Sequence, residues 1–93
     1  MVTMNWYRED EVLIFSGTKM KRYVLDLENE EKVYLIEYPI PNNYHIAINY
    51  LLIEERTVGE VMLHQADNFD MAKKWVEENF HRLRKLAKDN EPS

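Results

Sequence analysis

The C-terminal quarter of the chain carries the clearest pattern of hydrophobic and polar positions. At about 100° per residue, the apolar positions of residues 69–88 fall on one arc roughly 140° wide, with nearly every charge opposite. This period predicts a single amphipathic helix over 69–88. Asp67 or Asn68 is suited to cap its first amides, and Pro92 follows its end. The buried arc is expected to comprise Ala72, Trp75, Val76, Asn79, Phe80, Leu83, Leu86 and Ala87.

Upstream of residue 69 the period changes from 3.6 to about 2, which is typical of strands. The apolar and aromatic residues gather in six segments, at 4–8, 11–16, 20–28, 32–39, 44–53 and 58–66. Short polar breaks separate them, and breaks of this length favour hairpins between antiparallel neighbours. The breaks are Glu9-Asp10, Gly17-Thr18, Asn29-Glu30, Pro41 to Asn43 and Glu54 to Arg56.

The predicted fold class is therefore α+β, an antiparallel β-meander of five to six strands with the C-terminal helix packed on one face. Segment 44–55 is the ambiguous one, because Tyr44, Ala47, Leu51 and Glu54 would also share one side of a helix. We expect residues 1–89 to form one domain, followed by a short tail at 90–93.

Several strands are apolar on both of their faces. In 33–38, Val33 and Leu35 point one way while Tyr34, Ile36 and Tyr38 point the other. One helix can cover only one face, so the second face is expected to need a cover of its own. The N-terminal strands could curl over it, or a second copy of the chain could pack on it. Patches of this size favour a homodimer.

Composition narrows the class of protein. The chain has 93 residues, 45% of them hydrophobic, with two glycines and no cysteine, which is typical of one folded domain without disulfides. No apolar run reaches the roughly 18 residues of a membrane span, and the first residues lack a signal-peptide pattern. We expect a cytoplasmic protein.

Charge is unevenly distributed along the chain. Residues 1–69 hold six basic and twelve acidic residues, and residues 70–93 hold six and five, within a net charge of −5. An acidic body with a mildly basic end differs from the strongly basic surface of most nucleic-acid binders. It favours a protein partner that has basic patches.

The stretch DLENEE, residues 26–31, resembles the start of a calcium loop. Asp26 to Glu37 spans twelve residues with acids at loop positions 1, 3, 5 and 12. Position 6, where the loop turns sharply and requires glycine, is Glu31, and the flanks are strand-like. These acids are instead predicted to form a hairpin tip in water, and Glu28, Glu30 and Glu31 become candidates for protein binding together with Tyr34, Ile36 and Tyr38.

Catalytic and cofactor motifs are missing. The histidines have no spacing that would bring two ligands onto one metal ion, and two isolated glycines cannot build a phosphate loop. His64 with Asp67 could form an oriented imidazole pair, but the favoured interpretation is that His64 is a half-buried strand residue and Asp67 a helix cap. We expect no cofactor, no metal site and no enzymatic activity.

Three hypotheses remain, and the least favoured is an enzyme with a composite site near His64. The first is a small acidic protein-interaction module, a regulator or inhibitor of a protein partner; in type, the chain is similar to many accessory and inhibitor proteins of bacteria and their phages. The alternative is a protein that binds single-stranded nucleic acid through sheet aromatics and basic residues. Glu77 and Glu78 interrupt the basic side of the helix, which weakens that alternative. Its candidate contacts are Lys19, Lys21, Arg22, Arg82, Arg84 and Lys85.

Overall fold

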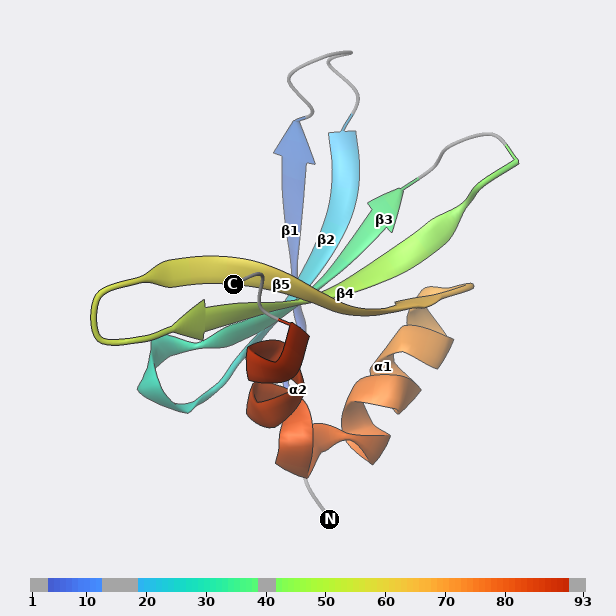
Figure 1. Ribbon diagram of the computed structural model, residues 1–93. Coiled ribbons are helices and arrows are strands. Elements are labelled where there is room, and N and C mark those ends of the chain that lie inside the picture. The colour runs from blue at the N-terminus through green and yellow to red at the C-terminus, as the bar shows by residue number, and fades with distance from the viewer. Residues whose placement is uncertain (1–3, 13–18, 39–41, 91–93) are drawn as a thin grey trace.

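A five-stranded antiparallel sheet followed by C-terminal helices forms the chain (Figure 1). The computed structural model describes residues 4–12, 19–38 and 42–90. The elements are β1 (Tyr7–Val12), β2 (Lys19–Asp26), the 3₁₀ turn η1 (Glu28–Glu30), β3 (Lys32–Tyr38), β4 (His45–Ile53), β5 (Val58–Ala66), α1 (Phe69–Glu78), the 3₁₀ turn η2 (Phe80–Arg82) and α2 (Leu83–Asn90).

The strands lie in the order in which they occur along the chain, β1-β2-β3-β4-β5, and every neighbouring pair is antiparallel. The predicted α+β meander is thereby confirmed. In Figure 1 β1 stands upright while β5 runs across the view. A twist of about 20–25° between neighbouring strands accumulates to this fan over four pairings.

Two of the predicted hairpin breaks are turns in the structure. At the first, Leu27 donates its backbone N–H to the Glu31 carbonyl at 2.8 Å, and Asn29 adopts φ 60°, a left-handed conformation that asparagine tolerates. At the second, Glu54 and Thr57 exchange backbone hydrogen bonds. Between these turns the ambiguous segment is a strand, β4.

The N-terminal prediction was wrong in one respect. Glu9 and Asp10 were expected to separate two strands, yet both lie inside β1. The register places them opposite Arg22 and Lys21 of β2, and the opposite charges of Glu9 and Arg22 stabilise the strand pair. Most of the expected strand at 11–16, from residue 13 on, lies outside the described ranges. The expected break at Gly17-Thr18 also lies outside them.

The C-terminal helix is broken, so the prediction of one helix over 69–88 was wrong in continuity. Asn68 caps α1 by accepting the Met71 N–H at 2.9 Å, which settles the choice between Asp67 and Asn68. At the other end, the Asn79 amide donates to the Trp75 carbonyl at 2.8 Å and its oxygen accepts two bonds from Arg82. These side-chain bonds compete with the helical ladder and mark the break at η2.

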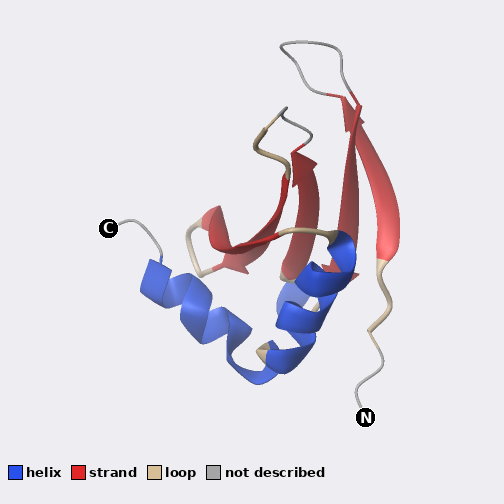
Figure 2. Ribbon diagram, turned by 90° about the vertical axis from the view of Figure 1, so that its right-hand side faces the viewer, coloured by secondary structure: helices blue, strands red, loops and turns tan. Residues whose placement is uncertain are grey.

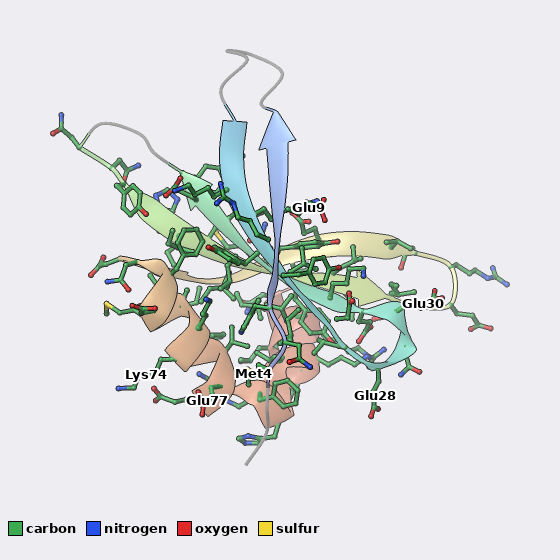
Figure 3. All side chains as sticks on the ribbon, turned by 180° about the vertical axis from the view of Figure 1, so that it is seen from behind. Met4, Glu9, Glu28, Glu30, Lys74 and Glu77 are labelled. Atoms are coloured by element: carbon green, nitrogen blue, oxygen red, sulfur yellow. The ribbon has the colours of Figure 1, made fainter. Side chains whose placement is uncertain are left out.

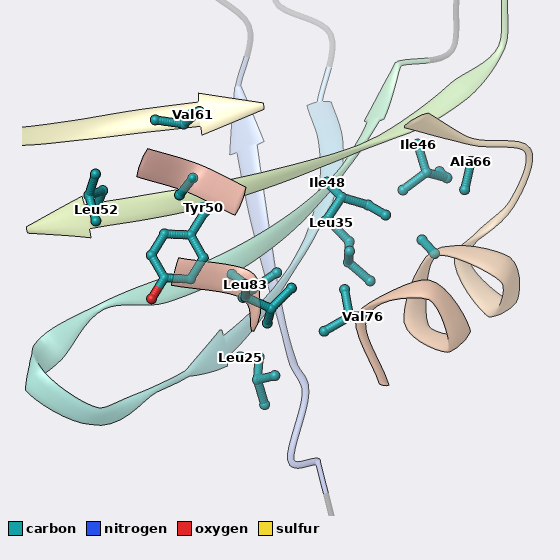
Figure 4. Close-up of a cluster of buried hydrophobic side chains, with 13 residues drawn as sticks. Leu25, Leu35, Ile46, Ile48, Tyr50, Leu52, Val61, Ala66, Val76 and Leu83 are labelled. Atoms are coloured by element: carbon teal, nitrogen blue, oxygen red, sulfur yellow. The ribbon is translucent and has the colours of Figure 1, made fainter. Parts of the chain in front are cut away.

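The core lies between one face of the sheet and the helices, which share one side of it (Figure 2). Leu35, Ile46 and Ile48 of the central strands are fully buried against Val76 and Leu83 (Figure 4). The helical arc read from the sequence is confirmed, since its members are buried or half-buried. Neither helix among residues 69–90 is long and apolar enough to cross a membrane.

Candidate functional site

The face of the sheet that points away from the helices is the main candidate site, and we call it the open face. Val33 and Leu35 pack into the core below the helices, so the residues that alternate with them point to the other side. Through the strand register, this open face includes Tyr7, Glu9, Met20, Arg22, Val24, Tyr34, Ile36, Tyr38, Ala47, Asn49, Val58, Glu60 and Met62.

Part of the open face is covered by the chain itself. Val24, Ile36 and Ala47 are between 0 and 4% exposed although no described helix lies on this side. Among the candidates for protein binding, Ile36 thus offers almost no surface to a partner, whereas Tyr34 and Tyr38 are half-buried. These three positions are therefore buried within the single chain.

A polar row crosses the open face from one edge of the sheet to the other. Glu9 of β1 forms an ion pair with Arg22 of β2, and the Arg22 guanidinium lies 4.6 Å from the centre of the Tyr34 ring on β3. Tyr34 is directly opposite Asn49 of β4, whose amide donates to Glu60 of β5 at 2.9 Å. Both ends of the row are therefore carboxylates (Glu9 is labelled in Figure 3).

Burial raises the pKa of Tyr34 above its ordinary value, and Arg22 and Lys32 lower it by a smaller amount. Tyr34 therefore stays protonated and neutral near pH 7. It offers an aromatic surface and a hydroxyl without a charge. At the end of the same strand, Tyr38 stacks on His45 with ring centres 5.1 Å apart.

Glu31 lies elsewhere than expected. Glu28 and Glu30 stand exposed at the hairpin tip as predicted (Figure 3), but Glu31 is only 3% exposed. Its carboxylate accepts hydrogen bonds from the Tyr50 hydroxyl at 2.5 Å, the Ile53 N–H at 3.1 Å and the Arg84 Nε at 3.3 Å. A buried charge persists when it is paired and hydrogen-bonded in this way.

A groove of about 520 Å³ lies beside this cluster, between the hairpin tip and the junction of η2 with α2. Its walls combine apolar side chains with acids from the tip and bases from the helices. The lining residues include Leu27, Glu28, Glu31, Tyr50, Phe80, His81 and Arg84. Since Arg84 holds Glu31 and Tyr50 is buried, this cluster ties the hairpin to the helices.

The basic candidates do not form one surface. Lys21 and Arg22 are adjacent on β2 and so point to opposite faces of the sheet. Lys19 is the first residue of the same strand. Arg82, Arg84 and Lys85 belong to the helical segment, on the far side of the sheet from Arg22. A strand of nucleic acid would have to wrap around the sheet to reach both groups.

His64 stacks on Trp75 of α1 with ring centres 4.9 Å apart and planes 7° from parallel. A groove of about 350 Å³ beside this pair is lined also by Asp67, Met71, Lys74 and Glu78. Of these lining residues, Met71, Lys74 and Glu78 belong to α1. Within the described ranges, no group of three histidine or acidic residues is placed to hold a metal ion.

Sequence reasoning missed most residues of the open face as site candidates, among them Asn49, Glu60 and Met62. The cross-strand partners of Asn49 and Glu60 depend on the register of β4 with β5. Both residues lie between the turn at Glu54–Thr57 and the register shift at Ile48/Asn49, so their pairing follows from the position of that turn.

The chain matches no family model, no curated protein and no solved structure at a significant level.

Proposed function

We propose that this chain is a protein-interaction module that regulates or inhibits a protein partner through the open face of its sheet. The observation that carries the proposal is the distribution of exposed apolar side chains. Five large ones stand exposed among the described residues, and three of them, Tyr7, Val58 and Met62, belong to the open face. Exposed apolar and aromatic side chains set among polar ones are typical of interaction surfaces.

The acidic ends of the polar row add a charge preference. Glu9 is balanced by Arg22, but Glu60 bonds to the neutral amide of Asn49 and keeps its negative charge. The chain as a whole is also negative, with a net charge of −5. A partner with a basic rim around an apolar patch fits this surface, and charges of opposite sign would speed its association.

The chain offers two matched pairs of variants for the test. Tyr7 and Tyr44 are 43% and 47% exposed, and Met62 and Met71 are 53% and 51% exposed, yet only the first of each pair lies on the open face. Partner capture from a native lysate is expected to fall at least about tenfold for Tyr7→Ser and Met62→Ser, as for residues that carry much of the binding energy of an interface. Tyr44→Ser and Met71→Ser should capture as the unchanged protein does.

Equal loss in both members of each pair would refute the proposal. So would salt-sensitive quenching of Trp6 and Trp75 fluorescence by single-stranded oligonucleotides, because that result supports the nucleic-acid alternative. Light scattering of the unchanged protein reports whether a second copy occupies the face, since a dimer that Met62→Ser dissociates would replace the separate partner.

A further inference from the structure

The outer edge of β5 carries fewer of the features that protect an edge strand than the edge formed by β1. β5 is the last strand of the sheet and pairs only with β4 among the described strands. An edge strand presents N–H and C=O groups that another chain can pair with, and proteins usually protect such edges with charges or bulges.

The two edges are protected to different degrees. Four of the six residues of β1 are charged, in the sequence Tyr-Arg-Glu-Asp-Glu-Val. In β5 the register shift follows Met62, so it distorts only the later part of the strand. The regular part, Val58–Met62, carries a single charge, that of Glu60. We call this five-residue segment the β5 edge.

Alternate side chains of the β5 edge form a row of apolar, acidic and apolar residues. Val58, Glu60 and Met62 all point to the open face and are all exposed, Val58 by 67%. One oxygen of Glu60 accepts the Asn49 amide at 2.9 Å, which orients the carboxylate. Gly59 has no side chain, and the space beside it is open, since a Cβ built on it would meet no atom within 4 Å.

We propose that the β5 edge binds an extended segment of the partner protein, added to the sheet as a sixth strand. Backbone hydrogen bonds would hold the segment, and alternate side chains would select it. The segment carries Lys or Arg opposite Glu60 and apolar residues two positions to either side, opposite Val58 and Met62. This inference rests on the proposed function and names the chemistry of the partner.

Charge favours such a partner over a second copy. A symmetric antiparallel pairing of two β5 edges sets Glu60 against Glu60 or against an apolar residue, Val58 or Met62. The first arrangement opposes like charges, and the second leaves the carboxylate without a counter-charge. A basic residue from another protein neutralises Glu60 in the same position.

The test uses the full chain and two synthetic peptides, Thr-Ile-Thr-Lys-Thr-Ile-Thr and its counterpart with Glu in place of Lys, both capped at their ends. We expect the lysine peptide to bind about three- to fivefold more tightly than the glutamate peptide, the range of one cross-strand charge pair. Amide hydrogen exchange should slow within Val58–Met62. Glu60→Lys is expected to reverse the preference, and Glu77→Lys, an equal charge change on the outer side of α1, should retain it (Figure 3).

The inference is overturned if neither peptide slows exchange in the β5 edge, if protection arises along β1 instead, or if Glu60→Lys leaves the preference unchanged. It is also overturned if light scattering finds a dimer that Glu60→Lys dissociates. These outcomes are separate from a failure of the proposed function. If Tyr7→Ser abolishes partner capture while Glu60→Lys does not alter peptide preference, the open face binds a partner without strand addition.

Discussion

The Glu31 carboxylate accepts a hydrogen bond from the Tyr50 hydroxyl at 2.5 Å, and both residues are buried. Nineteen positions separate them along the chain, and the contact joins the β2–β3 hairpin tip to β4. Through Arg84 the same carboxylate also reaches α2. Glu31 thus connects three elements, and removing its side chain should affect all three.

Glu31→Ala is expected to destabilise the fold by about 3 kcal/mol, since it leaves the Tyr50 hydroxyl and the Ile53 N–H without their acceptor. Urea unfolding measures this change. Glu28→Ala, on the exposed part of the same tip, is the control and should change stability by less than about 0.5 kcal/mol. Equal effects from the two variants would contradict the buried cluster.

Alkaline pH should weaken the fold through Tyr50. Burial, and then the bond to Glu31, raise the pKa of Tyr50 well above its ordinary value. The folded protein therefore keeps Tyr50 protonated, whereas the unfolded chain releases that proton near pH 10. This contribution to stability is complete below pH 10 and falls by up to about 1.4 kcal/mol per pH unit above it.

Unfolding measured between pH 9 and 11.5 tests this dependence. Tyr50→Phe removes the titrating hydroxyl, so its stability should fall less steeply over this range than that of the unchanged protein. Parallel slopes in the two proteins would show that the alkaline loss comes from other groups.

Asn79 controls the break between α1 and α2. Asn79→Ala removes bonds to the Trp75 carbonyl and to Arg82 at a position only 9% exposed, so we expect a loss of about 1 to 2 kcal/mol. Asn90 makes the same type of bond, from its amide to the carbonyl four residues earlier, but in an exposed position. Asn90→Ala should therefore cost less than about 0.5 kcal/mol in thermal unfolding.

Gly59→Ala is expected to stabilise the protein by about 0.4 to 1 kcal/mol. Space is open around the added methyl group, and alanine restricts the unfolded chain more than glycine does. Denaturant unfolding gives the sign. A destabilised variant would indicate that the backbone at Gly59 has a role beyond that of an ordinary edge residue.

The apolar segments upstream of residue 69, the short breaks between them and the helical arc at 69–88 were sufficient to predict the meander and its C-terminal helical segment. These patterns are local in the sequence. The same holds for Asn68, whose side chain caps the amide three residues ahead of it. Local spacing and residue type therefore determined the fold class of this protein.

Tertiary structure decided what lies across strands and between elements. Glu31 looked like one more acid of an exposed tip until the fold placed Tyr50, Ile53 and Arg84 around it. Glu9 looked like a break until the register set it opposite Arg22. At both positions the stabilising contacts come from residues that are distant in the sequence. The residues adjacent to Glu9 or Glu31 therefore could not predict these contacts.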